Sequence, residues 1–277
     1  MKDYGKTRLV SYSVAALSLF TRATPIKRRC VKRQIPVRNN GAVAVLLGLV
    51  VGTARLASAQ YDPLVQFSPS SNPNGLWSYG FISLPLGSPF NLLTLPTIVG
   101  TGVNAWVSPS FGGIGVLYNG TATIQTVTDP EDNAIYQPGM LAMHPGPNNE
   151  YAIVQFTVPT SGIYTFQGWF EGIDTSGTTT DVHLLVNNVD AAGNSVIGYG
   201  TSSERWVAFG PRFYNAGDTL AYAVGSGANG PAFDTTALIY AQILAVPEPS
   251  PYALLGLALV PLAVRAGFAR KRKAATA

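Results

Sequence analysis

Short apolar runs separated by turn-forming residues fill the second half of this sequence. Side chains alternate in character over residues 151–158, and further apolar runs follow at 163–170, 182–186, 220–224 and 238–243. Pro, Gly, Asn and Ser cluster between these runs, and no long segment carries the helical period. Many short strands at this spacing are typical of two packed antiparallel sheets. The sequence therefore predicts an all-β fold, an antiparallel β-sandwich of the jelly-roll type, over residues 60–245.

The N-terminal end has the features of an export signal. An apolar run at 41–52 has the length of a signal-peptide core, and Ala57-Ser58-Ala59 matches the site that signal peptidase cuts. We therefore predict that residues 1–59 are a basic leader and a signal-peptide helix. Cleavage after Ala59 would make Gln60 the first mature residue.

Residues 1–40 are longer and more basic than the usual start of a signal peptide, with Asp3 as their one acidic residue. Two interpretations stay open. The segment is either an arm that binds nucleic acid, or it is not translated, because the protein begins downstream at a residue such as Val31 or Val37.

Three features follow one another at the C-terminal end. They are Pro247-Glu248-Pro249, an apolar run at 252–264, and the basic cluster Arg270-Lys271-Arg272-Lys273. Counted to Phe268, the apolar segment has about 17 residues, the lower limit for crossing a bilayer. The basic cluster would stay on the cytoplasmic side as a membrane stop. We predict a transmembrane helix here; the alternative is a buried core helix of the domain.

These features resemble the PEP-CTERM sorting signal of Gram-negative bacteria, over residues 246–273. The resemblance implies recognition by exosortase, a membrane-embedded, transpeptidase-like cysteine protease, and cleavage near Pro247-Glu248-Pro249. It also implies a transient anchor in the inner membrane. The protein would then pass to the cell surface or to an extracellular matrix rich in exopolysaccharide.

Charge separates the middle of the chain from its ends. The whole chain has a net charge of +4. Between Gln60 and Val246, however, Arg205 and Arg212 are the only cationic residues against twelve acidic ones, a net charge of about −10. Such a domain would repel nucleic acid, so we exclude that partner class. Cys30 lies in the leader, so disulfides and thiol chemistry are excluded from the mature domain.

Most of the mature chain is similar to a group of secreted bacterial proteins that share this tail. The segments that carry the similarity are 67–80, 143–146, 158–164, 180–187, 216–220 and 234–236. The resemblance implies a jelly roll related to carbohydrate-binding modules, and it implies no activity.

Exposed aromatic rings are the usual platforms for sugars, because their faces stack on pyranose rings while nearby amides and acids bind hydroxyls. Trp77, Tyr79 and Trp169 are our candidates for glycan binding, and Trp106 and Trp206 are also present. The alternative for each aromatic residue is a place in the core. Trp77 and Tyr79 are two residues apart and share one strand face, whereas Trp169 continues the face of Ile163, Thr165 and Gln167.

The sequence holds few metal-ligating residues. His144 and His183 are its only histidines, and no cluster of acids accompanies them at ligand spacing. Asp129-Pro130-Glu131-Asp132 and the pair Asp218 and Asp234 are candidates for calcium, with solvated acidic turns as the alternative. We therefore predict no metal site and no cofactor. Asn119-Gly120-Thr121 matches a glycosylation sequon, which we interpret as a turn signal.

Catalysis has little support. Glu150, Glu171 and Glu204 could supply the carboxylate pair of a glycosidase, but their spacing does not show that they converge. No Gly-x-Ser-x-Gly elbow occurs, and the glycines at 112–115 lack the context of a nucleotide site. We predict a protein that is not an enzyme: a secreted, exosortase-processed binding or structural component of the exopolysaccharide layer. The alternatives are a carbohydrate-active enzyme and a calcium-dependent adhesin.

Overall fold

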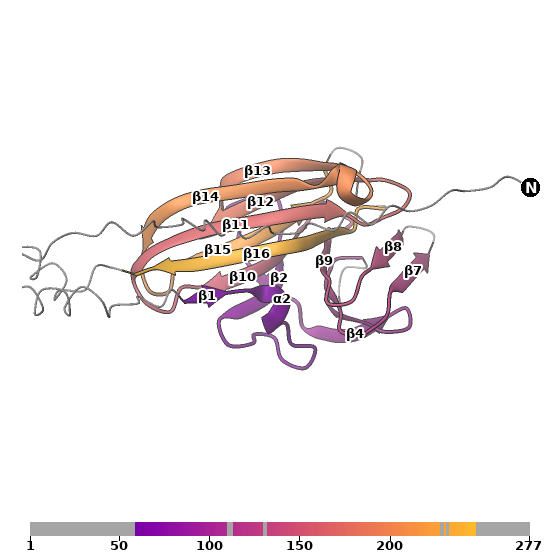
Figure 1. Cartoon of the computed structure of the whole chain (residues 1–277), viewed down its shortest axis with the longest axis horizontal. Coiled ribbons are helices and arrows are strands. Elements are labelled where there is room, and N and C mark those ends of the chain that lie inside the picture. The colour runs from indigo at the N-terminus through magenta and orange to yellow at the C-terminus, as the bar shows by residue number, and fades with distance from the viewer. Residues whose placement is uncertain (1–58, 110–112, 130–131, 228–229, 231–232, 248–277) are drawn as a thin grey trace, which may run out of the picture. The chain divides into compact units, whose positions relative to one another are not determined.

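Two antiparallel sheets form the domain in the computed structural model, which describes residues 59–109, 113–129, 132–227, 230 and 233–247 (Figure 1). Sheet A has the strand order β14 (Arg205–Tyr214), β11 (Gly162–Gly172), β16 (Thr236–Val246), β9 (Leu141–His144), β6 (Gly115–Asn119), β5 (Val103–Val107) and β4 (Leu95–Val99), and β1 (Gln60–Tyr61) also pairs with β16. Sheet B has the order β13 (Val189–Gly198), β12 (Thr178–Val186), β15 (Thr219–Gly225), β10 (Tyr151–Thr157), β2 (Trp77–Ile82) and β3 (Asn91–Leu92). The hairpin of β7 (Gln125–Asp129) and β8 (Asp132–Tyr136) forms a separate two-stranded sheet.

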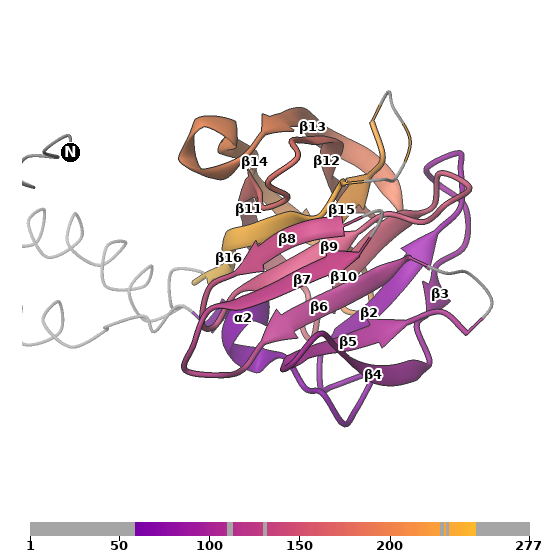
Figure 2. The ribbon, with the colours of Figure 1, turned by 90° about the vertical axis from the view of Figure 1, so that its right-hand side faces the viewer.

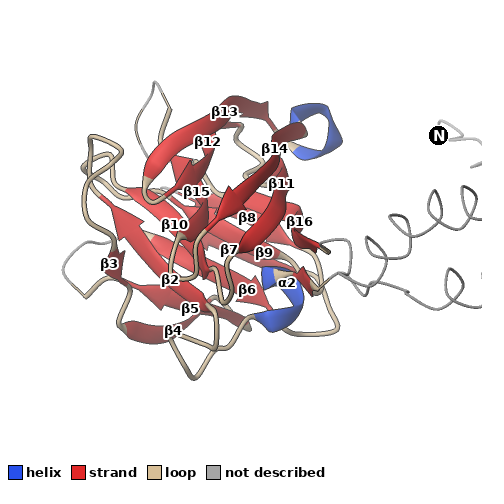
Figure 3. Cartoon of the chain, turned by 90° about the vertical axis from the view of Figure 1, so that its left-hand side faces the viewer, coloured by secondary structure: helices blue, strands red, loops and turns tan. Residues whose placement is uncertain are grey.

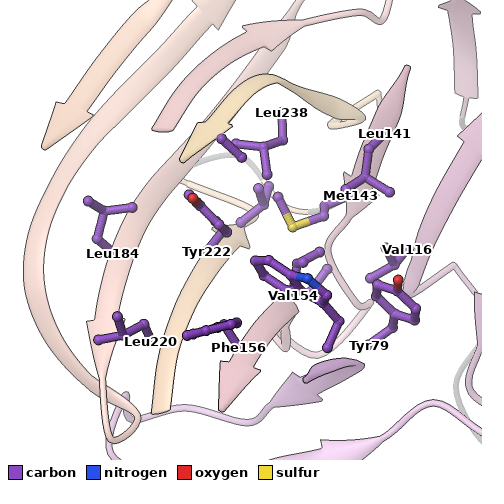
Figure 4. Packing of buried hydrophobic residues seen from close by; sticks show 14 of the residues in the cluster. Tyr79, Val116, Leu141, Met143, Val154, Phe156, Leu184, Leu220, Tyr222 and Leu238 are labelled. Carbon is purple, nitrogen blue, oxygen red and sulfur yellow. The ribbon is translucent and has the colours of Figure 1, made fainter. Parts of the chain in front are cut away.

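The inner faces of the two sheets pack against each other. Figure 4 shows Tyr79, Val154 and Phe156 of sheet B among Val116 and Leu141 of sheet A. Each strand contributes alternate residues to this core because successive side chains point to opposite faces. In β11, for example, Tyr164, Phe166 and Phe170 are buried while Ile163 and Trp169 are exposed. The antiparallel β-sandwich that the alternation predicts is therefore confirmed.

The outer faces of the sheets are covered unevenly. The β7–β8 hairpin lies against the outer face of sheet A at β5, β6 and β9 (Figure 2), where Val127 and Tyr136 pack on Ala105, Leu117 and Ala142. On sheet B, Leu86 and Phe90 of the β2–β3 connection cover Ile82, Ile153 and Ala221. The outer face of sheet A at β11, β14 and the middle of β16 has no such cover within the described residues, and exposed aromatic side chains lie there.

The turns follow the residues that the sequence places between the strands. The β12–β13 hairpin turns at Asn187 and Asn188, whose φ angles of 50° and 67° lie in the left-handed region. A two-residue hairpin needs positive φ at both positions, and Asn tolerates it better than other residues with a Cβ. The only helices within the described residues are the four-residue α2 (Pro63–Gln66) and η1 (Gly200–Ser203), a 3-10 helix (Figure 3).

Strands account for more of the chain than the sequence indicated. The predicted strands at 151–158, 163–170, 182–186, 220–224 and 238–243 are confirmed as β10, β11, β12, β15 and β16. From the sequence we named no individual strand at 95–144, where the structure has β4 to β9. These strands are at most five residues long, and β5 and β6 are largely buried on both faces, so their sequences do not alternate clearly.

The two ends of the domain lie beside each other. In β1, Gln60 pairs with Leu244, and the carbonyl of Ala59 accepts a hydrogen bond from the Ala245 amide (3.0 Å). Strand β16 ends at Val246, immediately before Pro247. No helix among the described residues is long and apolar enough to cross a membrane. The predicted signal-peptide helix, the apolar run at 252–264, Glu248, Pro249 and the basic cluster at 270–273 lie outside the described residues.

Candidate functional site

Two of the three aromatic residues predicted to bind glycan are core residues. Trp77 is 1% exposed and Tyr79 is 0% exposed, on the inner face of β2. The Trp77 indole donates a hydrogen bond to Gln66 Oε1 (2.7 Å), and its ring lies 5.2 Å from that of Phe156. Their ring faces are therefore closed to any ligand, and the prediction for Trp77 and Tyr79 was wrong. Trp106 is also buried.

Trp169 is the centre of an exposed aromatic row on the outer face of sheet A. It pairs across the sheet with Trp206 of β14 on one side and with Tyr240 of β16 on the other. The three side chains are 40%, 44% and 37% exposed, respectively. Ring centres lie 5.8 Å apart for Trp169 and Trp206, and 6.0 Å apart for Trp206 and Tyr240. We call Trp169, Trp206 and Tyr240 the aromatic face.

Polar side chains flank the aromatic face on both sides. On one side Gln167 pairs with Gln242, and Gln167 Nε2 donates to Gln242 Oε1 (2.7 Å) and to the Tyr240 hydroxyl (3.4 Å). On the other side lie Glu171, two residues beyond Trp169, and Glu204, two residues before Trp206. Burial raises the pKa of Glu171, and the nearby charge of Glu204 raises it further.

This arrangement has the chemical groups that hold a sugar chain. The indole and phenol rings offer apolar surface to the C–H faces of pyranose rings, and the amides and carboxylates beside them can donate to and accept from hydroxyls. The sequence put Trp169 on the face of Ile163, Thr165 and Gln167 without deciding whether that face is inner or outer. It gave no sign that Trp206 and Tyr240 are its neighbours, since their register depends on strands far apart in the chain.

The two histidines lie on different sheets. His144 ends β9 in sheet A, and its Nδ1 lies 2.8 Å from the Pro145 carbonyl oxygen. His183 lies on the outer face of β12 in sheet B, between Asp181 (2.9 Å) and Asp190 (3.0 Å). No group of three or more metal-ligating side chains is found within the described residues.

His183 makes the stability of the fold depend on pH. Burial lowers the pKa of His183, but hydrogen bonds to Asp181 and Asp190 and their charges outweigh burial and raise it above its usual 6.5. Its stabilising effect is therefore complete below pH 6.5 and is lost as the pH rises through the raised pKa. We expect His183→Gln to cost about 1 kcal/mol at pH 5.5 and much less at pH 8.5 in urea unfolding. An equal cost at both pH values would contradict this role for His183.

The acidic residues considered for calcium do not form one site. Asp218 directly precedes β15. Asp234 accepts a hydrogen bond from the Thr179 amide (2.8 Å), which lies near the opposite end of β15. At a rise of about 3.3 Å per residue, the two carboxylates are roughly 20 Å apart. Asp218 and Asp234 are therefore too far apart to bind one calcium ion together. Asp234 is fully buried, and burial raises its pKa to about 6. Asp129 and Asp132 pair at the turn of the β7–β8 hairpin.

Glu150 lies away from the other two candidate carboxylates. It is buried in the turn before β10, where its oxygens accept hydrogen bonds from the backbone and the side chain of Asn148 (2.9 and 3.0 Å). Only Glu171 and Glu204 are near enough for the charge of one to affect the other.

Comparisons with known proteins give neither a family nor a function. No family model matches the chain, and no curated protein matches it. One similar structure contains the CBM51-2 and INT domains of ZmpB from Clostridium perfringens, in complex with GlcNAc. It matches at 11% identity and a TM-score of 0.31, and the match covers 55% of this chain and 30% of that chain. A family 35 carbohydrate binding module from Clostridium thermocellum matches at 10% identity and a TM-score of 0.29. The match covers 69% of this chain and 99% of the module. A cyclase from Fischerella sp. TAU matches at 12% identity and a TM-score of 0.34. The match covers 69% of this chain and 100% of the cyclase. Values this low carry no argument about function, and the three include both binding modules and an enzyme.

Proposed function

We propose that this chain is a non-catalytic protein of the cell surface or extracellular matrix, and that its β-sandwich binds neutral polysaccharide on the aromatic face. The observation that carries the proposal is the row of Trp169, Trp206 and Tyr240, half-exposed on the part of sheet A that the β7–β8 hairpin leaves uncovered. Exposed apolar clusters of this kind on a folded domain usually mark a binding surface.

The charge of the domain selects the kind of polysaccharide. Twelve acidic and two cationic residues between Gln60 and Val246 would repel a polyanion at a distance. Glu171 and Glu204 beside the aromatic face add a local barrier to anionic sugars. A neutral chain meets no such penalty, because its hydroxyls can donate to both carboxylates.

Export and sorting belong to the same proposal. The signal peptide at 1–59 would be removed by signal peptidase, and exosortase would cut the inner-membrane intermediate near Pro247-Glu248-Pro249, in a Gram-negative host. Intact mass spectrometry of the extracellular protein tests this step. A chain that begins at Gln60 and ends near Val246 supports it, and a chain found in the cytosol with both ends intact contradicts it.

Affinity electrophoresis tests the binding site. We expect gels that contain neutral exopolysaccharide to retard the wild-type protein. Trp169→Ala and Trp206→Ala should each weaken this retention at least about tenfold, because one stacked ring contributes roughly 1–3 kcal/mol to binding. Ile98→Ala, at an exposed apolar residue of the edge strand β4, is the matched control and should be retarded like the wild type. Equal retardation of all four proteins would exclude the aromatic face.

The carbohydrate-active enzyme is the second candidate, because burial and Glu204 raise the pKa of Glu171 in the direction that a general acid requires. Reducing ends released from the same polysaccharides distinguish the two functions. Release by the wild type that Glu171→Gln abolishes would replace the binding proposal with a glycosidase. A calcium-dependent adhesin would instead lose retention in the presence of a chelator.

A further inference from the structure

An open cavity of about 520 Å³ lies at the edge of the sandwich, away from the aromatic face. It forms where β13, the edge strand of sheet B, meets β14, the edge strand of sheet A. Its lining includes Phe209 and Arg212 of β14, Val189 and Asp190 of β13, and Asp218 of the β14–β15 turn. Cavities of this volume are typical of small-molecule sites in proteins.

A bulge in β14 directs Arg212 into this cavity. Phe166 pairs with Phe209, and Tyr164 pairs with Arg212. These pairs are two residues apart on β11 but three residues apart on β14, so β14 contains one extra residue between them. Side chains three residues apart point to opposite faces of a regular strand, and the extra residue returns Arg212 to the side of Phe209. The guanidinium carbon then lies 4.4 Å from the centre of the Phe209 ring.

Of the two cationic residues in the described part of the chain, Arg212 is the one whose side chain has no polar partner there. Arg205, the other cationic residue between Gln60 and Val246, donates through Nη1 to the Glu204 carbonyl (2.7 Å). The Arg212 guanidinium makes no ion pair or hydrogen bond with any described residue. Stacking on Phe209 fixes the plane of its guanidinium and leaves the N–H groups at the edge of that plane available to a ligand.

The two carboxylates of the cavity are already held by protein donors. Asp190 lies 3.0 Å from His183 Nδ1. Asp218 accepts from the Asn215 amide (2.7 Å) and from Asn187 Nδ2 (3.1 Å), and these bonds lower its pKa. Asp218 therefore stays ionised, and both carboxylates offer acceptor oxygens to the cavity that Arg212 also lines.

These charges define the class of ligand. Arg212 disfavours a cation, whereas Asp190, Asp218 and the net charge of the domain disfavour an anion. A neutral polyol ring satisfies the cavity: neighbouring hydroxyls accept from the guanidinium fork and donate to the carboxylates, and the C–H face packs on the exposed apolar side chain of Val189.

We propose that this cavity is a second carbohydrate site, which takes a single neutral sugar residue at a chain end or a branch. It rests on the proposed function, since the ligand class is the same neutral glycan. The aromatic face spreads across three strands and suits internal residues of a chain, whereas the cavity is bounded on two sides and suits one ring.

Binding of methyl glycosides of glucose, galactose and mannose, with methyl glucuronide as the anionic probe, tests the site. The full-length chain is purified in mild detergent, and dissociation constants are measured by saturation-transfer NMR. We expect saturable binding of at least one neutral glycoside, and a loss of at least about tenfold in Arg212→Ala and in Phe209→Ala, which removes the ring under the guanidinium. Arg205→Ala removes an equal charge outside the cavity and should bind like the wild type.

The outcomes separate this site from the aromatic face. Trp169→Ala should keep its affinity for the glycoside while losing retention on polysaccharide. The site is overturned if no neutral glycoside binds the wild type, if Arg212→Ala binds as tightly as the wild type, or if methyl glucuronide binds more tightly than every neutral glycoside. Failure of polysaccharide retention with glycoside binding intact would overturn the aromatic face alone.

Discussion

Replacing Trp77 by alanine is expected to lower the free energy of unfolding by about 4 kcal/mol, the upper range for loss of a large buried side chain. Trp77 is fully enclosed between the sheets, and its substitution leaves a cavity beside Phe156. It also leaves the side chain of Gln66 without the indole donor. Urea denaturation followed by circular dichroism measures the change.

Trp169→Ala is the matched comparison, because it removes the same side chain from a half-exposed place. We expect it to cost less than about 1 kcal/mol of stability and to weaken retention on polysaccharide at least about tenfold. The two variants thus separate a core tryptophan from a binding tryptophan. A tolerated Trp77→Ala, or a Trp169→Ala that unfolds the domain, would contradict the assignment of these two residues.

Replacing Asn119 by alanine is expected to cost about 3 kcal/mol, because four hydrogen bonds of one buried side chain are lost. Its Nδ2 donates to the carbonyls of Thr123 and Tyr136 (both 2.9 Å), and its Oδ1 accepts from the amide and the hydroxyl of Thr121 (3.0 and 2.7 Å). These bonds hold the β6–β7 connection against the end of β8. The same engagement closes the Asn119-Gly120-Thr121 sequon to glycosylation in the folded domain.

Thermal and urea unfolding of three variants measure this effect. Asn119→Asp keeps the acceptor but loses both donors and buries a charge, so it should be at least as unstable as Asn119→Ala. Asn91→Ala removes an exposed asparagine whose bond to the Pro89 carbonyl is local, and should change stability by less than about 0.5 kcal/mol. Equal stability of the Asn119 and Asn91 variants would show that the buried network is not stabilising.

Periodicity predicted the later strands but not the environment of each face. In β10 the side chains of Tyr151, Ile153 and Gln155 lie on the outer face of sheet B, yet they are buried, and Leu86 and Phe90 cover part of that face. Alternation likewise showed that Trp77 and Tyr79 share a face without showing which face. Only packing between distant segments decides that, so two of the three predicted glycan contacts were placed wrongly.

The candidate sites depend on cross-strand register, which no local pattern encodes. Trp169 meets Trp206 and Tyr240 through pairings across about 40 and 70 residues of chain. The bulge that directs Arg212 does have a local sign, since Gly210-Pro211 interrupts an otherwise regular strand. That sign could have indicated an irregularity in β14, but not which side chain it would turn toward the cavity.

The indole N–H signals of the four tryptophans test the central claim most directly, because two belong to the core and two to the aromatic face. In a proton–nitrogen correlation spectrum, each signal is assigned from a single Trp→Phe variant, and a neutral oligosaccharide of the retained polysaccharide is then titrated in. The account predicts that the signals of Trp169 and Trp206 shift with saturation while those of Trp77 and Trp106 stay in place. Movement of the Trp77 or Trp106 signal, with Trp169 and Trp206 unmoved, would contradict it.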